Sequence, residues 1–323
     1  MRLPRRTFLQ FAAGAAALPA LARRAAAAEY PARPVHIVVG FPPGLATDIA
    51  SRLIAQALSE RMGRQFVVDN RPGAGGNIAA ETVVRASPDG YALLGASVAN
   101  TVNATLYRNL SFNFSRDFVP VGLVDRVPNV VVVNPSVPAA TLAEFIAYAK
   151  ANPGKINYAS AGNGSASNTS GELFKMMAGV DLLHVPYRAS FITDLLAGQV
   201  QASFPPVPLT IGYIRDGKLR ALGVTSAARS DALPGVPAVA EVLPGFEATG
   251  WHGIAAPKNT PAEIVARLNK EINASLADPA LKAKFANLGS EAAPMTTDEF
   301  ATFIRAETDK WAKVIAFAGL KVE

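Results

Sequence analysis

The chain has 323 residues, of which 50% are hydrophobic and 17% charged, and it contains no cysteine. This composition excludes a disordered chain, and the length predicts about two domains. Disulfides, thiolate metal sites and cysteine nucleophiles are excluded, and the three histidines lie too far apart in sequence for a metal-ligand motif. The net charge of +6 is misleading, because residues 1–28 contain five arginines and no acidic residue. The rest of the chain carries a net charge of only +1, which argues against a nucleic-acid partner.

The first 28 residues have the pattern of an export signal. A basic segment at 2–6 precedes an apolar stretch at 8–22, which is too short to span a bilayer comfortably. Small residues up to Ala28 then offer a signal-peptidase site. The pair Arg5-Arg6 favours the twin-arginine route, with a Sec signal or an uncleaved anchor as alternatives. We expect cleavage near Ala28 and, in the absence of a cysteine for lipidation, a soluble periplasmic product.

After the signal, short apolar runs alternate with amphipathic segments. The spacing predicts a strand at 35–39, a helix at 48–62, a strand at 66–69, a helix at 77–86 and a strand at 91–94. Strands separated by helices in this way predict a parallel sheet with both faces covered.

A second block repeats the same alternation. It predicts strands at 130–133, 156–160, 183–185 and 221–224, with helices at 141–152 and around 172–177. Thr141 and Glu144 form a capping pair at the start of the first of these helices. The block therefore predicts a second layered α/β unit.

The pattern changes near residue 250. Thr260 is predicted to cap a helix that has Pro261 at its first position and Glu263 in its first turn. Two more helices are predicted near 279–288 and 298–318. A helical stretch without strands cannot easily form a third domain, so we expect it to pack on the first unit.

The middle block is then an insertion, reached by two crossings of the chain at 119–126 and 249–256. We expect one lobe from residues 29–122 and 252–323 and a second lobe from residues 123–251. Two lobes joined by paired crossings leave a cleft, where α/β proteins bind ligands at the carboxyl ends of their strands.

The first candidate binding segment is the turn at 41–48, between the first strand and the first helix. Gly44 allows a ligand to approach the backbone, and the helix start presents unpaired N–H groups and a positive dipole end, which suit a carboxylate. Spacing alone favours an ordinary β–α turn capped by Thr47 or Asp48, because no phosphate-loop lysine and no G-x-G-x-x-G are present. The candidate contacts in this turn are Phe41, Pro42, Gly44, Leu45, Ala46, Thr47 and Asp48.

The second candidate segment is the polar turn at 161–168, which also links a strand to a helix. It offers hydroxyls, an amide and flexible backbone donors, and the alternative is a polar surface loop with a helix cap. The shared strand-to-helix context favours a binding role for both turns. The candidate contacts here are Ala161, Gly162, Asn163, Gly164, Ser165 and Asn168.

Two other places are candidate sites. Ser97, between Ala96 and Val98, faintly resembles a nucleophile elbow, although the final glycine is missing and a serine hydrolase needs a histidine partner. Arg188 has the chemistry to clamp a carboxylate, with a surface arginine as the equal alternative. Its neighbours Tyr187 and Ser190 complete the candidate set. No cofactor or metal motif is present in the sequence.

Several segments carry a resemblance to a known family. They are Tyr30-Pro31-Ala32-Arg33-Pro34, Asp69-Asn70-Arg71-Pro72-Gly73-Ala74-Gly75-Gly76, Ser87-Pro88-Asp89-Gly90-Tyr91, Asn152-Pro153-Gly154-Lys155 and Gly217-Lys218-Leu219-Arg220-Ala221-Leu222. Together they resemble the Bug family, the periplasmic solute receptors of tripartite tricarboxylate transporters. The resemblance covers essentially the whole mature chain, and its most specific part is the run 70–76 together with Asp89-Gly90-Tyr91.

The resemblance implies a type II periplasmic-binding-protein fold of the α/β class, with two lobes that close about a hinge around one ligand. It implies a receptor rather than an enzyme, with small organic carboxylates as ligands. In the family the carboxylate is held by backbone amides, hydroxyls and waters of two loops that map onto 41–48 and 161–168. The implied partner is a membrane permease or a sensor kinase, and we expect a monomer without cofactor.

Three departures from the family pattern fall at the expected cleft. Leu45 stands where the first loop usually has a second glycine, Asn168 stands where the second loop usually has histidine, and the segment 189–192 is about two residues shorter than usual. They favour a bulkier or aromatic acid, or loss of the usual carboxylate mode. The alternatives are therefore a sensor-only or binding-altered paralogue and a periplasmic serine hydrolase that uses Ser97 or Ser165.

Overall fold

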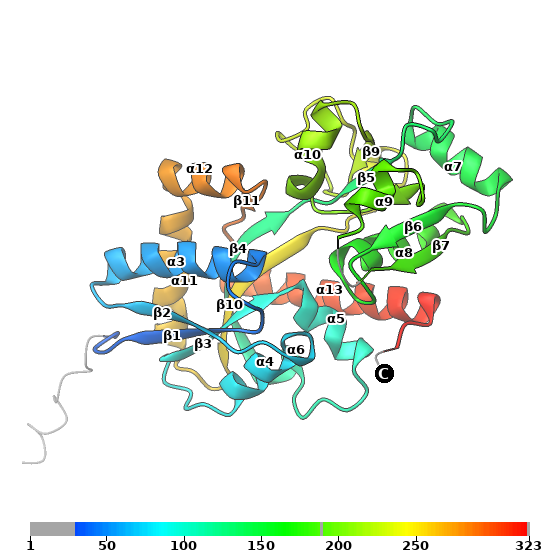
Figure 1. Cartoon of the computed structure of the whole chain (residues 1–323). Helices are drawn as coiled ribbons and strands as arrows, with labels where there is room; N and C mark the ends of the chain where they lie inside the picture. Colours follow the sequence, from blue (N-terminus) through cyan, green and yellow to red (C-terminus); the bar gives the residue numbers. More distant parts are fainter. Residues whose placement is uncertain (1–29, 188–189, 322–323) are drawn as a thin grey trace, which may run out of the picture.

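The computed structural model describes residues 30–187 and 190–321, so the expected export signal lies outside the described residues. The described chain forms two α/β units, each built on one sheet (Figure 1). None of the described helices is long and apolar enough to cross a membrane.

The first sheet has six strands within the described residues, in the order β11-β4-β10-β3-β1-β2. β1 pairs in parallel with β2 and β3, and β10 pairs antiparallel with β3 and β4. The parallel strands are apolar on both faces because helices cover both sides. The strands are β1 (Val35–Val39), β2 (Phe66–Asn70), β3 (Ala92–Ser97), β4 (Phe118–Val127), β10 (Gly250–Pro257) and β11 (Glu291–Ala292).

The helices predicted for this unit are present, with small differences at their ends, and two further helices at 98–106 and 114–117 were not predicted. The first helix begins at Ala46, two residues before the predicted start, because Leu45 adopts the extended conformation of an N-cap. The helices before the insertion are α3 (Ala46–Met62), the 3₁₀ turn η1 (Ala74–Gly76), α4 (Asn77–Val84), α5 (Val98–Leu106) and α6 (Phe114–Asp117). Those after it are α11 (Ala262–Leu276), α12 (Pro279–Asn287) and α13 (Thr297–Ala318).

The second sheet has five strands in the described chain, in the order β7-β6-β8-β5-β9. β6 pairs in parallel with β7 and β8, whereas β5 pairs antiparallel with β8 and β9. The strands are β5 (Val130–Val133), β6 (Asn157–Ser160), β7 (Leu183–Pro186), β8 (Ala202–Ser203) and β9 (Arg220–Val224). The helices are α7 (Leu142–Ala151), α8 (Ala166–Ala178), α9 (Ile192–Leu196), α10 (Val207–Arg215) and the 3₁₀ turn η2 (Val239–Glu241).

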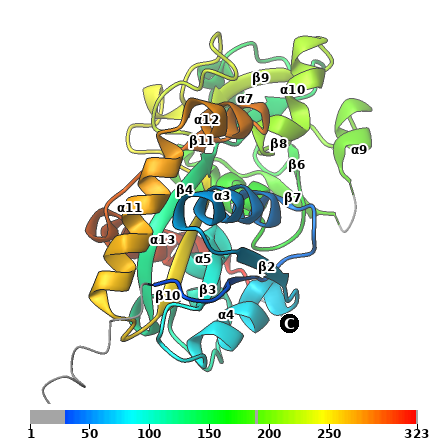
Figure 2. The same ribbon diagram turned by 90° about the vertical axis from the view of Figure 1, so that its left-hand side faces the viewer.

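The strands β4 and β10 connect the two units. They pair with each other from Phe118–Pro257 at one end to Val127–Gly250 at the other. In Figures 1 and 2 they run side by side toward the second unit, where β4 leads into β5. β4 and β10 therefore form a two-stranded connection between the units.

The C-terminal part differs from the sequence-based expectation at the start of α11 and in an added strand. Thr260 does not cap α11: its hydroxyl donates to the carbonyl of Pro257 at 2.8 Å, and Pro261 is the N-cap residue. This part of the chain also contributes the short strand β11, which pairs with β4.

The last helix, α13, packs on both units rather than on the first alone. Phe300 and Ile304, in its first half, belong to a core with the first sheet. Trp311 and Val314, in its second half, belong to a core with strands and helices of the second unit. In Figure 1 the helix runs below the second unit and next to α5 and β4 of the first.

Candidate functional site

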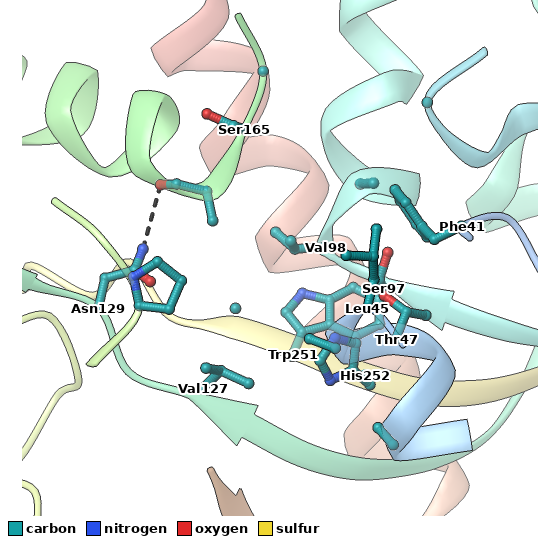
Figure 3. A pocket seen from close by; sticks show the side chains of 18 of the residues that line it. Phe41, Leu45, Thr47, Ser97, Val98, Val127, Asn129, Ser165, Trp251 and His252 are labelled. Atoms are coloured by element: carbon teal, nitrogen blue, oxygen red, sulfur yellow. Dashed lines mark hydrogen bonds between the residues drawn. The ribbon is translucent and has the colours of Figure 1, made fainter. Parts of the chain in front are cut away.

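A cavity of about 1220 Å³ lies between the two units and is lined by residues of both. In Figure 3, Leu45, Thr47 and Ser97 lie on one side, Ser165 and Asn129 lie on the other, and Trp251 and His252 lie between them. Most of the lining is apolar. The side chains that make it so are Phe41, Leu45, Val98, Leu106, Val127, Pro206, Pro208, Leu209, Trp251 and Leu288.

The first residues of four helices line this cavity. α3, α5, α8 and α10 start there, and their N-cap residues Leu45, Ser97, Ser165 and Pro206 all belong to the lining. The first N–H groups of a helix have no partner within the helix and carry the positive end of its dipole. The start of α10 does not present free N–H groups, because Val207 donates to the carbonyl of Pro128, Pro208 has no N–H and Leu209 donates to the carbonyl of Pro206. The starts of α3, α5 and α8 around one hollow favour an anion, because they attract negative charge without a basic side chain.

The loop 41–48, between β1 and α3, is held in shape by Asp48. The backbone amide of Gly44, at φ +85°, donates to Asp48 Oδ2 at 2.9 Å. Arg52 Nε donates to the same oxygen at 3.0 Å, and Asn70 Nδ2 donates to the other oxygen at 2.8 Å. Asp48 is only 2% exposed, so its carboxylate organises the loop from behind and does not face the cavity.

These contacts also fix the charge state of Asp48. Burial alone would raise the pKa of its carboxyl group, but the hydrogen bonds from Arg52, the Gly44 amide and Asn70 outweigh burial and hold the pKa below its usual value. Asp48 is therefore ionised at neutral pH. Its charge is balanced locally by the guanidinium of Arg52.

The run 70–76 supports the same loop. Asn70 Nδ2 also donates to the carbonyl of Phe41 at 3.0 Å. A Cβ at Gly40 would lie 2.5 Å from the Cα of Gly76, so the two turns touch through bare backbone. This explains why glycine is required here: any side chain at Gly40 would push the turns apart.

The loop 161–168, between β6 and α8, repeats the arrangement of the first loop. The amide of Gly164, at φ +76°, donates to Asn168 Oδ1 at 2.9 Å. Asn168 is fully buried, and its Nδ2 donates to the hydroxyl of Tyr158 at 3.0 Å. Ser165 caps α8 by accepting a hydrogen bond from the Asn168 amide. Asn168 thus supports the loop from behind, as Asp48 does in the other unit.

His184 belongs to this support and does not line the cavity. Its Nε2 lies 2.6 Å from the hydroxyl of Ser160, and its ring stacks on Tyr158 at 4.9 Å between centroids. Burial lowers the pKa of His184, so the neutral ring is favoured. This serine–histidine pair has a structural role beneath the loop.

The structure brings nine of the candidate residues together around the cavity and leaves the others outside its lining. The nine are Phe41, Gly44, Leu45, Ala46, Thr47, Ser97, Asn163, Gly164 and Ser165. Those outside the lining are Pro42, Asp48, Ala161, Gly162, Asn168, Tyr187 and Ser190. Tyr187 donates instead to Asp194 at 2.7 Å, and Ser190 accepts from the amide of Ile192. Arg188 lies outside the described residues.

Several lining residues were missed by the sequence analysis. Asp125, Asn129, Trp251 and His252 line the cavity. Two polar atoms in this group are buried without a hydrogen-bond partner, Trp251 Nε1 and Asn129 Oδ1. One sequence feature could have identified these residues as part of the site: they lie in or just after the predicted crossings at 119–126 and 249–256.

The geometry does not assemble a serine nucleophile. Ser97 lies opposite His252 in the sheet register, and His252 lies opposite Asp125. His252 Nδ1 lies 2.7 Å from Asp125 Oδ1, but in the described part of the chain no hydrogen bond joins Ser97 to His252. An activated serine requires that bond to its base. The described residues also contain no group of three or more potential metal ligands.

Two α/β units that face each other across a cavity lined by helix starts define a two-lobed binding protein. Among known families, the model of the tripartite tricarboxylate transporter family receptor, TctC, matches residues 50–320. The chain belongs to this family of periplasmic solute-binding receptors, which confirms the resemblance and the fold class inferred from the sequence.

Known relatives cover almost the whole chain. Protein BugT of Bordetella pertussis strain Tohama I is 37% identical over 299 residues, which cover 91% of this chain and 92% of BugT. The structure of Rpa4515 of R. palustris with adipate is 36% identical, with a TM-score of 0.76, and the match covers 90% of this chain and 99% of that one. MatC of Rhodopseudomonas palustris with bound malate is 30% identical, with a TM-score of 0.72, over 88% of this chain and 100% of that one.

Proposed function

We propose that this receptor captures a small organic carboxylate in the cavity between its units and delivers it to the permease of a tripartite tricarboxylate-type transporter. The observation that carries the proposal is the convergence of the starts of α3, α5 and α8 on one largely apolar cavity. An apolar wall with a few oriented N–H donors suits an organic acid, because its carbon chain and its charge need different surroundings.

We propose that the carboxylate binds between the loops 41–48 and 161–168. The candidate contacts from the first loop and from Ser97 face those from Asn163, Gly164 and Ser165 across the cavity. Adipate and malate in two similar structures support an aliphatic dicarboxylate as the first ligand class to test. Leu45, which is 51% exposed and lines the cavity, adds apolar surface that also suits a larger acid.

Binding is proposed to close the cavity by hinge movement. A volume of about 1220 Å³ exceeds the range of roughly 300–1,000 Å³ for sites that enclose small ligands. A small acid therefore contacts both loops only if the units approach each other. In this proposal residues 29–122 and 252–323 form one lobe, residues 123–251 form the other, and β4 and β10 contain the hinge. Closure is then a population shift driven by contacts to both lobes.

We also propose how the protein is exported, where it acts and which partner it meets. Residues 1–28 are proposed to direct export, through the twin-arginine route, and to be removed near Ala28. The mature chain would act in the periplasm as a monomer without cofactor and without turnover of its ligand. A sensor kinase in place of the permease is the alternative partner.

Calorimetric titration of the mature chain with monocarboxylates, dicarboxylates and aromatic carboxylates tests the ligand class. The expected result is saturable binding of at least one acid with one site per chain, and no binding of the matching uncharged amide. Small-angle scattering should show a smaller radius of gyration with the bound acid. Failure of every acid to bind or to raise the melting temperature would contradict the proposal and favour a binding-altered paralogue.

A further inference from the structure

One polar pair on the cavity wall is not explained by the carboxylate site at the helix starts. His252 on β10 and Asp125 on β4 are paired across the two strands that connect the units, with Nδ1 and Oδ1 2.7 Å apart. Their side chains are only 10% and 3% exposed, and both line the cavity. A buried histidine and aspartate in this arrangement fix the ring, because Nδ1 is committed to the carboxylate. The second ring nitrogen, Nε2, is then the one left for a ligand.

A second donor lies next to this pair. Trp251 lines the cavity, is fully buried, and its Nε1–H has no partner. The ring is held by edge-to-face contacts with Phe300 and Phe303, at 5.8 and 5.7 Å between centroids. Buried N–H groups are nearly always hydrogen-bonded, so an unpartnered indole donor at a cavity wall points to an acceptor supplied by a ligand.

We infer that His252, oriented by Asp125, and Trp251 form a second recognition site for an acceptor oxygen at the far end of the ligand. The inference rests on the proposed function, in which the first carboxylate binds at the helix starts, and it makes the ligand an acid with two carboxylates. The ring donates from Nε2 to this oxygen, and the carboxylate of Asp125 at Nδ1 balances the charge of a ring that donates from both nitrogens. Asp125 is thus a positioning residue, whereas His252 and Trp251 contact the ligand.

The charges around His252 and Trp251 favour an anionic group at the far end of the ligand. Among the described residues, the charged side chains in the lining apart from His252 are Asp125 and Lys321. Asp48 is turned away toward Arg52, and Arg126 is held by Glu247 at 2.7 Å. A monoacid would place a methyl group against the donors of Trp251 and His252 and leave them unpaired. Sites built to hydrogen-bond a group discriminate strongly against ligands that lack it.

Calorimetry with matched acids tests the inference. The probes are straight-chain diacids of four to eight carbons, including adipate, each compared with the monoacid of the same length. For the unmodified chain we expect at least about tenfold tighter binding of the diacid at one or more lengths, which corresponds to one charge-assisted hydrogen bond. The quantity compared between variants is this diacid-to-monoacid ratio.

Two substitutions of His252 separate recognition from folding. His252→Asn places an amide near the position of Nδ1 and retains the bond to Asp125, but nothing replaces Nε2. His252→Gln places its amide nitrogen near the position of Nε2. We expect the ratio to fall toward one in His252→Asn and to be partly retained in His252→Gln, at similar melting temperatures. Trp251→Phe, which keeps an aromatic ring and removes only the N–H, should lower the ratio by a smaller factor.

The outcomes distinguish the inference from the proposed function. An unchanged ratio in His252→Asn would overturn the inference, as would equal or tighter binding of monoacids by the unmodified chain. Binding of an aromatic monocarboxylate without any diacid would also overturn it and leave the proposed function standing. If the unmodified chain binds no acid at all, both are overturned.

Discussion

Asp48 and Asn168 hold equivalent positions in the two loops of the cavity. Each accepts a hydrogen bond of 2.9 Å from the amide of the glycine four residues earlier, Gly44 in one loop and Gly164 in the other. Both glycines have positive φ, and both acceptors are almost fully buried. The two units thus build their loops by the same device, with a charged acceptor in one and a neutral acceptor in the other. The amide oxygen of Asn168 thus supplies the acceptor that this geometry needs.

Removal of either acceptor should loosen its loop. We expect Asp48→Ala and Asn168→Ala each to lower the free energy of unfolding by about 1–3 kcal/mol, because the glycine amide and the other donors to the buried acceptor lose their partner. Each should also weaken binding of an acid ligand by about tenfold or more. Urea unfolding and calorimetry measure the two effects. Asp48→Asn, which keeps an oxygen for the Gly44 amide, is the matched control and should lose less affinity than Asp48→Ala.

The lowered pKa of Asp48 predicts a pH-dependent part of stability. A carboxyl group whose pKa is lower in the folded chain stabilises the fold while it is ionised. This contribution is complete above the unfolded-chain pKa of about 3.9 and is lost as the pH falls through the lower value in the folded chain. The difference in unfolding free energy between the unmodified chain and Asp48→Asn should therefore be larger at pH 6 than at pH 2.5.

Urea unfolding at the two pH values checks this sign. Asp231→Asn removes one negative charge at an exposed position and serves as the control, with an expected change within about 0.5 kcal/mol at pH 6. A difference for Asp48→Asn that grows as the pH falls would contradict the prediction.

Gly164 should be sensitive to a side chain because it packs directly against Leu106 of the first unit. A Cβ at Gly164 would lie 2.7 Å from Leu106 Cδ2, and φ there is +76°. Gly179, at the end of α8, has φ +61°, but a Cβ there would meet nothing within 4 Å, so this position isolates the backbone strain. We expect Gly179→Ala to cost about 1–2 kcal/mol and Gly164→Ala to cost more. A double-mutant cycle with Leu106→Ala should give a coupling of at least about 0.5 kcal/mol, and additive effects would argue against the contact.

Leu45 should control ligand preference more than stability. Its side chain is half exposed and lines the cavity, and its φ of −81° does not require glycine. Glycine is also acceptable as an N-cap residue, so Leu45→Gly should change the unfolding free energy by less than about 1 kcal/mol. Affinities for small aliphatic and larger aromatic acids should shift by different factors in calorimetric titrations. Equal factors across the panel would show that Leu45 does not contribute to selectivity.

The two tryptophans allow ligand binding to be followed by fluorescence. Trp251 lines the cavity, whereas Trp311 is buried in α13 with its Nε1–H donated to Glu307 at 2.9 Å. A bound acid should therefore change the emission of Trp251. Trp311→Phe should retain the ligand-dependent change and Trp251→Phe should abolish it. The reverse result would place the ligand away from the cavity wall that Trp251 forms.

Local patterns were sufficient to predict most of the architecture. Apolar runs bounded by turns located the central strands, and two crossings were predicted where β4 and β10 connect the units. The Thr260 cap was wrong because the sequence allows two hydroxyl arrangements and the hydroxyl bonds Pro257 instead of a helical N–H. The packing of α13 was only partly predicted, since an apolar stripe does not say which of two cores it fills.

Part of the candidate site could also be predicted from local patterns. The loops 41–48 and 161–168 are visible because strand-to-helix turns have a local signature. Asp125 and His252 are 127 residues apart and meet only through the antiparallel register of β4 and β10. Nothing local to either residue encodes that register, so their pairing required the structure. The supporting roles of Asp48 and Asn168 were also hidden, because spacing cannot tell which way a side chain turns.

The position of α13 determines when, during synthesis, the core of the middle unit can be completed. Trp311 and Val314 fill a core whose other members come from the middle of the chain, such as Phe145 and Phe174. A nascent chain still attached to the ribosome therefore exposes that core until residues 297–318 have emerged. The middle unit therefore completes its core only after this helix has been synthesised, and a chain truncated before this helix presents an uncovered apolar surface to chaperones and proteases.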